Sequence, residues 1–208
     1  AYGIPILKFL TGKVSQKPKD QDADTYLSKG LALAEKGDFQ EAFTNFDQAI
    51  KLNPNFAEAY HNRGAARSDL GDKQGAIADD DQAIKLNPNL AGVYYNRGNS
   101  RFALGDKQGA IADLDQAIKL NPNEALYYFS RGTIHYRLGN YQSAIADLDQ
   151  RIKLNPNDAN AYNNRGGVRF NLGDKQGAIA DFDQAINLNP NDANAYNNRG
   201  GVRFDLGD

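Results

Sequence analysis

The sequence predicts an all-α protein built as a solenoid of antiparallel helix pairs, and three observations support that prediction. The string GDKQGAIAD begins at Gly71, Gly105 and Gly173, and its variant GNYQSAIAD begins at Gly139. Successive copies start 34 residues apart or at twice that distance, and a Leu-Asn-Pro tripeptide recurs with the same period. No segment of useful length alternates apolar and polar residues as a half-buried strand does. A fixed period of this length is typical of stacked structural repeats.

The period divides the chain into an N-terminal segment, five repeats and one half repeat. Residues 1–22 precede the repeats, and the half repeat, 193–208, contains a first helix only. The five full repeats span 23–56, 57–90, 91–124, 125–158 and 159–192. The half repeat either caps the array or marks a cut through a longer natural protein, and we favour the cut.

Each repeat is predicted to form two helices joined by a Leu-Gly-Asp turn. Gly71 suits a left-handed cap at the end of the first helix, and Asp72 can accept unpaired amide hydrogens at the start of the second. In the first repeat, Asp38 and Glu41 have the spacing of a capping box. The second helix ends before Pro88, because proline lacks an amide donor and restricts the preceding residue. A single repeat buries too few apolar side chains to offset the entropy of ordering its backbone, so the repeats must stack.

Composition and charge exclude several classes of function. The net charge is −2 and the basic residues are spread along the chain, so there is no basic stripe for nucleic acid. Cysteine is absent, and the two histidines, His61 and His135, lie in different repeats. The acidic run 79–81 lacks the glycine and terminal glutamate of a calcium loop. We therefore expect no cofactor and no metal.

The chain is also expected to be soluble. Its most apolar run, residues 4–10, is too short to span a bilayer. The composition leaves the compartment undetermined, and we favour the cytoplasm over a periplasmic or lumenal location.

The repeat residues resemble the signature of the tetratricopeptide repeat family. In the second repeat, the spacing of the family is matched by Tyr60, Gly64, Ala76, Ala83 and Pro88. The fifth repeat matches it with Tyr162, Gly166, Ala178, Phe182, Ala185 and Pro190. The Tyr-x-x-Arg-Gly and Leu-Asn-Pro motifs are similar to those of bacterial arrays of this family. The resemblance implies a right-handed superhelix whose first helices form a concave groove, and a non-enzymatic scaffold that binds a peptide or partner helix there.

Two columns of charged residues depart from the family pattern. Where the family usually has leucine, this chain has arginine, and on the second helix an aspartate replaces a usual aromatic residue. Counting outward from the turn of an antiparallel pair places Arg63 opposite Asp79. We therefore predict four structural ion pairs: Arg63–Asp79, Arg97–Asp113, Arg131–Asp147 and Arg165–Asp181. Such pairs specify helix register more than they add stability. The alternative is that the arginines clamp a phosphate or carboxylate ligand.

The first repeat lacks this charged set. The positions of Arg63, Arg67 and Asp79 hold Lys29, Leu33 and Asn45 in the first repeat. All three positions change together, which indicates that the residues act as a coupled group.

Side chains on the first helices that the helix–helix contacts do not use are the candidate ligand contacts. Aromatic rings in a concave wall are favoured contacts for a peptide, and asparagine amides both donate to and accept from a peptide backbone. The predicted groove residues are Tyr95, Asn96, Asn99, Phe102, Phe129, Thr133, Tyr136, Asn163, Asn164 and Phe170. The alternative is that the rings pack against the neighbouring repeat and that the amides form local caps or bind water.

Three features have no assigned role. Arg151 stands where other repeats have alanine, so it either displaces a close helix contact or extends into solvent. Asp80 occupies a column that is otherwise apolar. The segment 1–22 carries lysines beside apolar residues, and it covers the first repeat, contacts an anionic membrane or forms a tail; we favour the first interpretation.

The favoured function is an adaptor that binds another protein, of unknown identity, through a peptide or helix in the groove. Two alternatives stay open. One is a structural module that associates with itself, and the other is a regulatory region of a larger protein.

Overall fold

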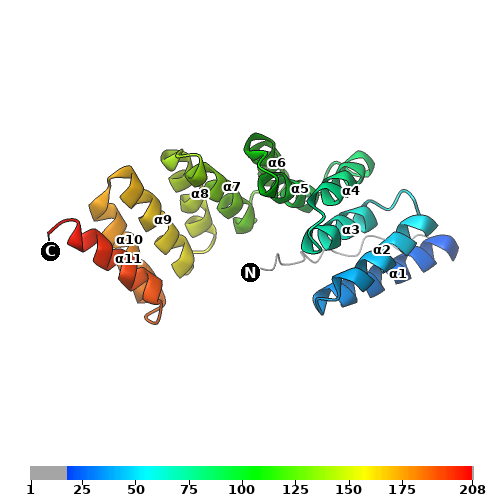
Figure 1. Ribbon diagram of the computed structural model, residues 1–208, viewed down its shortest axis with the longest axis horizontal. Helices are drawn as coiled ribbons and strands as arrows, with labels where there is room; N and C mark the ends of the chain where they lie inside the picture. Colours follow the sequence, from blue (N-terminus) through cyan, green and yellow to red (C-terminus); the bar gives the residue numbers. More distant parts are fainter. Residues whose placement is uncertain (1–17, 208) are drawn as a thin grey trace. The chain divides into compact units, whose positions relative to one another are not determined.

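The computed structural model describes residues 18–207, and the regular structure of that range is entirely helical. Its eleven helices are α1 (Pro18–Glu35), α2 (Phe39–Leu52), α3 (Ala57–Asp69), α4 (Lys73–Leu86), α5 (Ala91–Ala103), α6 (Lys107–Leu120), α7 (Ala125–Arg137), α8 (Tyr141–Leu154), α9 (Ala159–Leu172), α10 (Lys175–Leu188) and α11 (Ala193–Phe204). The predicted all-α class and the antiparallel pairing of the helices are confirmed (Figure 1).

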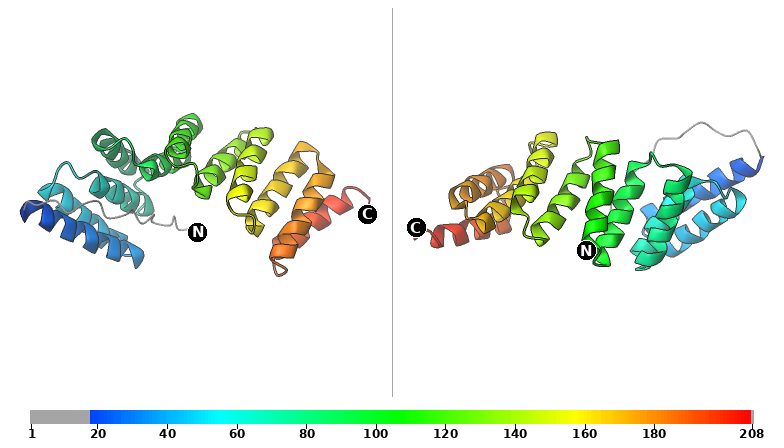
Figure 2. Two further views of the ribbon diagram at one scale, coloured as in Figure 1. Left: turned by 180° about the vertical axis from the view of Figure 1, so that it is seen from behind. Right: turned by 90° about the horizontal axis from the view of Figure 1, so that it is seen from above.

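The chain divides into two compact bodies. The N-terminal body, Ala1–Leu120, contains α1 to α6, and the C-terminal body, Asn121–Asp208, contains α7 to α11. Within either body each odd-numbered helix packs against the next even-numbered one, and that helix packs in turn against the following odd-numbered helix. The views of Figure 2 show this side-by-side order for α9, α10 and α11. We call α1, α3, α5, α7, α9 and α11 the first helices and the others the second helices.

The turn between paired helices depends on two glycines. Gly71 has a φ of +92°, in the left-handed region that favours glycine. Asp72 then accepts a hydrogen bond from the Gly75 amide at 2.8 Å. A Cβ atom on Gly75 would lie 2.1 Å from Asp72 Oδ2, so any other residue at this position would force the capping carboxylate to shift.

The capping box predicted in the first repeat is wrong. Asp38 precedes α2 but makes no side-chain capping bond. Glu41 stands where the later turn has Gly75, and in that later turn a Cβ at this position would lie 2.1 Å from the capping carboxylate.

The core combines small residues that let the helices approach closely with larger side chains from both helices of a pair. Alanines such as Ala76, Ala83, Ala178 and Ala185 are almost fully buried. One buried column on the second helices holds Phe46, Asp80, Leu114, Leu148 and Phe182, and the first helices add buried residues such as Tyr127 and Ile134. This close packing holds the exposed faces of the first helices in place.

The N-terminal end of the described range adds two facts. Helix α1 begins at Pro18, so its first turn lies within the segment 1–22. The predicted contact of that segment with the first repeat falls largely on residues 1–17, which lie outside the described residues. Over residues 18–207, none of the helices is both long enough and apolar enough to cross a membrane.

Candidate functional site

The repeated Tyr-x-x-Arg-Gly motif organises a buried ion-pair layer between the paired helices. Arg63 on α3 donates two parallel hydrogen bonds to Asp79 on α4, at 2.9 Å from Nε and 2.6 Å from Nη2. The same bidentate geometry recurs in Arg97–Asp113, Arg131–Asp147 and Arg165–Asp181. The structure thus brings together all four arginine–aspartate pairs named from the sequence.

Arg63, Arg97 and Arg165 each bind a second carboxylate that the sequence analysis missed. Arg63 Nη1 donates to Asp47 on α2, at 2.7 Å, so one guanidinium joins two successive helix pairs. The same link occurs in Arg97–Asp81, Arg165–Asp149 and Arg199–Asp183. The available signal was an aspartate that recurs at this position in all five second helices.

A second arginine column and a tyrosine column complete the layer. Arg101 Nη1 donates to Asp113 at 2.8 Å, so this buried carboxylate holds two arginines. Arg67 and Arg169 contact the corresponding aspartates in their own pairs. The motif tyrosine stacks on the motif arginine, with 5.4–5.9 Å between the guanidinium carbon and the ring centre. Because these contacts use the hydrogen-bond donors of the arginines within the fold, they weigh against the alternative that the arginines clamp an anionic ligand.

The ion-pair layer also changes proton affinities. The hydrogen bond to Asp79 raises the pKa of the Arg63 guanidinium, against the opposing effect of burial. A hydrogen bond from Lys51, assisted by one from Arg63, lowers the pKa of Asp47 despite the opposing effect of burial. Both groups are therefore held in their charged forms.

The α3–α4 pair contains a second buried polar contact, between His61 and Asp80. The Nδ1 atom of His61 lies 3.4 Å from Oδ1 of Asp80, and the aspartate has no solvent exposure. Its Oδ2 atom finds no hydrogen-bond partner among the described residues. Burial raises the pKa of Asp80 to about 6, although the contact with His61 opposes that shift. Asp80 therefore pairs with His61, which stands where the third and fourth repeats have Tyr95 and Phe129.

One of the aromatic residues predicted to line the groove is buried and another is half-buried. Tyr95 is only 4 % exposed, because α5 packs against α3, α4 and α6. Phe129 is half-buried and packs against Leu148 and Val168, between three helices of the C-terminal body. The prediction of groove exposure is therefore wrong for Tyr95, and the Phe129 ring contributes to packing between helices.

Arg151 accounts for the unusual environment of Phe129. Its guanidinium lies 4.2 Å from the centre of the Phe129 ring, and its Nε donates to Asp158 at 2.6 Å. Asp158 caps α9 by accepting from the Ala161 amide. Arg151 therefore neither displaces a close contact nor reaches into solvent; it joins α8 to the start of α9 and covers the ring.

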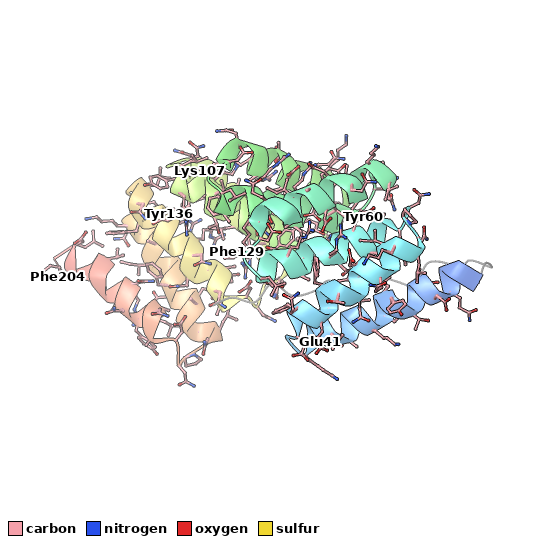
Figure 3. All side chains as sticks on the ribbon, turned by 45° about the vertical axis from the view of Figure 1, so that its right-hand side comes forward. Glu41, Tyr60, Lys107, Phe129, Tyr136 and Phe204 are labelled. Carbon is pink, nitrogen blue, oxygen red and sulfur yellow. The ribbon has the colours of Figure 1, made fainter. Side chains whose placement is uncertain are left out.

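The other predicted groove residues differ in exposure. Phe170 packs against the cluster of Ala178, Phe182 and Val202. Asn96, Asn99 and Phe102 on α5 are half-buried, as are Thr133, Asn163 and Asn164 in the C-terminal body. Tyr136 is 42 % exposed (Figure 3).

The first helices of the C-terminal body share a polar surface with defined hydrogen bonds. Asn171 on α9 donates from Nδ2 to the Tyr136 hydroxyl on α7, at 3.1 Å. Asn198 on α11 donates to Oδ1 of Asn163 on α9, also at 3.1 Å. We call these four residues the amide surface. Asn171 was missed because its counterparts in other repeats are charged or alanine, so no repeated pattern marks it.

Within residues 18–207, no cluster of three or more His, Asp or Glu side chains could hold a metal ion.

Comparison with known protein families matches nearly the whole helical array. A family profile described as tetratricopeptide repeat matches residues 95–159, 132–193 and 163–208. A second tetratricopeptide profile matches residues 57–90, and a profile described as TPR repeat matches residues 30–71.

Solved structures show the same arrangement. MamA protein is 27 % identical to this chain with a TM-score of 0.73, and the match covers 83 % of this chain and 94 % of MamA. YrrB is 22 % identical with a TM-score of 0.71, over 86 % of this chain and 92 % of YrrB. PilF of Pseudomonas aeruginosa is 16 % identical with a TM-score of 0.77, over 91 % and 92 %.

No curated protein sequence matches the chain. The family profiles extend over more than half of its length, and the helix pairs carry the expected small residues and turns. The chain therefore belongs to the tetratricopeptide repeat family, whose members typically mediate protein–protein interactions.

Proposed function

We propose that the chain is a scaffold that binds an extended peptide of a partner protein on the amide surface of the C-terminal body. The observation that carries this proposal is the pair of hydrogen bonds that fix the side chains of Tyr136, Asn163, Asn171 and Asn198 across three first helices. These groups are held on rigid elements before any ligand arrives, which lowers the entropy cost of binding.

The chemistry of the amide surface matches a peptide backbone. Each asparagine amide has two donor hydrogens and an acceptor oxygen. The bond from Asn198 to Asn163 uses one donor of the first and one acceptor site of the second. Asn171 donates to both the Tyr136 hydroxyl and the Gly167 carbonyl, so it keeps its Oδ1 atom as an acceptor. This oxygen and the remaining groups of Asn163 and Asn198 suit the N–H and C=O groups of an extended chain. Tyr136 adds an exposed apolar ring with a polar tip, a side chain that is common in protein interfaces.

The nearby arginines contribute little charge for recognition. Arg165 is engaged by Asp181 and Asp149, and Arg199 by Asp183. We therefore expect a ligand recognised by hydrogen bonds and ring contacts, with binding that depends weakly on salt concentration. YrrB, which has the same fold, is described as a TPR protein with an unusual peptide-binding site, and this precedent supports the proposal.

Selection from a random peptide library, followed by titration of the selected peptides, tests the proposal. The double variant Asn171→Ala, Asn198→Ala removes one amide from each hydrogen-bonded pair. We expect it to bind the selected peptides at least about 10-fold more weakly, because two charge-neutral hydrogen-bonding sites are lost. Asn187→Ala, on the exposed side of the second helix α10, is the matched control and leaves affinity unchanged. Equal affinities for the double variant and the control would reject the amide surface as the site.

A further inference from the structure

Helix α9 contains a glycine that the fold itself does not require. Gly167 lies in the interior of α9, where glycine is less favourable than alanine because it adds backbone entropy to the unfolded chain. It does not adopt the positive φ of the turn glycines. The neighbouring Gly166 has a packing reason, since a Cβ atom there would lie 2.7 Å from the Phe182 ring. At Gly167, in contrast, no atom lies within 4 Å of the position that a Cβ would take.

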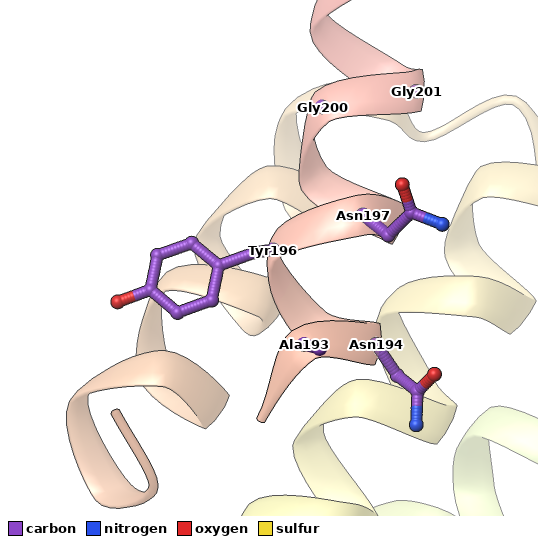
Figure 4. A pocket seen from close by; sticks show the side chains of 6 residues that line it. All are labelled: Ala193, Asn194, Tyr196, Asn197, Gly200 and Gly201. Carbon is purple, nitrogen blue, oxygen red and sulfur yellow. The ribbon is translucent and has the colours of Figure 1, made fainter. Parts of the chain in front are cut away.

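The open space over Gly167 lies on a helix that has neighbours on both sides. Helix α9 packs against α8 and α10 and also contacts α11. Gly200 and Gly201 have open Cβ positions as well, but they lie on α11, the last helix of the described range (Figure 4). Apart from turns and close packing, the usual reason for a glycine is the close approach of a ligand to the backbone. Among these three glycines, only Gly167 combines this open space with flanking helices.

Two asparagines of the amide surface flank Gly167 on the same face of α9. Asn163 lies four residues before it and Asn171 four residues after it, about one helical turn away on each side. Asn163 accepts a hydrogen bond from Asn198 on α11. Asn171 donates to the Tyr136 hydroxyl on α7. The two side chains are therefore drawn to opposite sides of α9, and the space over Gly167 stays open between them.

We propose that Gly167 determines the specificity of the amide surface by accepting a small side chain, alanine or serine, of the bound peptide. This inference rests on the proposed function, because it concerns the same site. It adds the register of the peptide on α9 and the size of one of its residues.

The spacing of the two asparagines fits an extended peptide that runs along α9. Asn163 and Asn171 are eight residues apart, which corresponds to about 12 Å along the helix axis. An extended chain rises about 3.3 Å per residue, so about four peptide residues cover this distance. Successive side chains of an extended chain point to opposite faces. A side chain near the middle of this stretch therefore points at Gly167.

The two amides limit the size of that side chain. An asparagine side chain is short, so the peptide main chain must lie close to α9 if it is to bond with both Asn163 and Asn171. The peptide side chain that points at the helix then has only the space left by the missing Cβ of Gly167. A methyl or hydroxymethyl group fits there, whereas a larger group would lift the main chain away from the amides.

Gly167→Ala tests the inference by filling this space while it strengthens the helix. Peptides are selected from a random library on the intact parent protein and are then titrated against both proteins. The variant is expected to bind them at least about 10-fold more weakly, because its methyl group takes the space of the peptide side chain. Its denaturant midpoint is expected to rise, since alanine favours a helix more than glycine and no described atom is displaced. Weaker binding by a more stable protein would separate a direct contact from damage to the fold.

Gly200→Ala is the matched control. Residues 193–204 repeat the sequence of residues 159–170, so the same change is made in the same local sequence. The counterpart of Gly200 in α9 is Gly166, which faces Phe182 of α10 and not the open space over Gly167. This variant is expected to bind the selected peptides as the parent does.

A substitution in the peptide provides a complementary test. When the small residue over Gly167 is replaced by glycine, the loss caused by Gly167→Ala is expected to fall from about 10-fold or more to less than about 3-fold. The reason is that two side chains no longer compete for one space. Replacing each peptide residue by glycine in turn identifies the position.

The outcomes separate this inference from the proposed function. If the selected peptides are weakened by Asn171→Ala, Asn198→Ala but bind Gly167→Ala and Gly200→Ala equally well, the amide surface is the site and the role of Gly167 is rejected. The role is also rejected if no glycine substitution in the peptide reduces the loss. If the parent selects no peptide, or if the double asparagine variant binds as tightly as the parent, the proposed function is rejected and the inference with it.

Discussion

The helix pairs α1–α2 and α5–α6 share a backbone arrangement but are held together by different side chains. In α1–α2 the buried Phe46 ring is surrounded by Leu31, Leu33 and other apolar residues. In α5–α6 the corresponding layer contains Arg97 and Asp113, joined by two hydrogen bonds. Both pairs bury an apolar residue in the same column, Phe46 or Leu114, and share the turn and the alanine positions, but only α5–α6 adds an ionic layer.

The difference shows that the charged residues work as a set. Where the first pair replaces one aspartate by Asn45, that amide bonds locally to the Glu41 carbonyl, and Lys29 lies over the Tyr26 ring. No buried charge is left without a partner at these positions. An ionic layer has no such tolerance, because removing one member leaves the others desolvated and unpaired.

The largest effect is expected from breaking the ionic layer at its centre. Asp113→Ala leaves Arg97 and Arg101 without their shared carboxylate, and we expect a loss of about 3–5 kcal/mol in the free energy of unfolding. Denaturant unfolding followed by far-UV circular dichroism measures the loss. Because stability in repeat arrays is partly local, hydrogen exchange of α5 and α6 amides shows whether the damage stays in this pair. A loss below about 1 kcal/mol would show that the layer behaves as an exposed salt bridge does.

The next largest effect concerns the α3–α4 pair, which differs from both compared pairs. It buries the carboxyl group of Asp80 at the position where they have Phe46 and Leu114. Burial raises the pKa of Asp80 to about 6, above its value of about 4 in the unfolded chain. Between these two values the folded state binds more protons than the unfolded state, so the contribution of Asp80 to stability falls as pH rises. The penalty is absent below about pH 4 and complete above about pH 6.

Asp80→Asn removes this ionisation and keeps the shape of the side chain. The difference in unfolding free energy between the variant and the parent is expected to grow by about 2–3 kcal/mol, in favour of the variant, as the pH rises from 4 to 7. The charged groups that act on Asp80 are His61, Arg97 and Asp79, and all three are retained. Asp81→Asn, at the neighbouring exposed position, is the control, and its difference in unfolding free energy from the parent should not grow in this way with pH. A pH-independent difference for Asp80→Asn would contradict the raised pKa.

A smaller effect is expected when the whole ionic set of α5–α6 is exchanged for the residues found at the same positions in α1–α2. The triple variant Arg97→Lys, Arg101→Leu, Asp113→Asn reproduces the residue types of α1–α2. We expect its unfolding free energy to lie within about 1.5 kcal/mol of the parent, because no buried charge loses its only partner. Subtracting the effects of the three single variants Arg97→Lys, Arg101→Leu and Asp113→Asn from that of the triple variant gives the coupling energy of the set. A triple variant as unstable as Asp113→Ala would mean that the two layers are not interchangeable.

The smallest effect is expected from the carboxylate that joins successive pairs. Asp81 binds the same guanidinium as Asp113 but has a side chain that is 54 % exposed. Asp81→Ala should therefore cost less than about 1 kcal/mol, and the cost should shrink further at high salt. Denaturant unfolding of the parent and of Asp81→Ala in low and high salt measures this cost and its dependence on salt. A cost that approached that of Asp113→Ala would show that burial does not control the strength of these contacts.

Much of the fold followed from local patterns, and part of the site did not. The period, the left-handed Gly71 turn and the Asp72 cap depend on residues close together in the chain. The spacing from the turn was enough to place Arg63 opposite Asp79. The exposure of Tyr95 could not be found in this way, because burial depends on how many neighbouring helices surround a first helix.

The sequence by itself determined that helices pair every 34 residues, since glycine, alanine and proline at fixed spacing act through local backbone geometry and close contact. Only the tertiary structure decided which side chains of the first helices pack between helices and which remain on the surface. Phe129 lies under Arg151, whereas Tyr136 remains on the surface, where it bonds to Asn171. The physical reason is that a side chain's neighbours across a helix interface come from residues far away in the chain, and their positions are set by the stacking of the repeats.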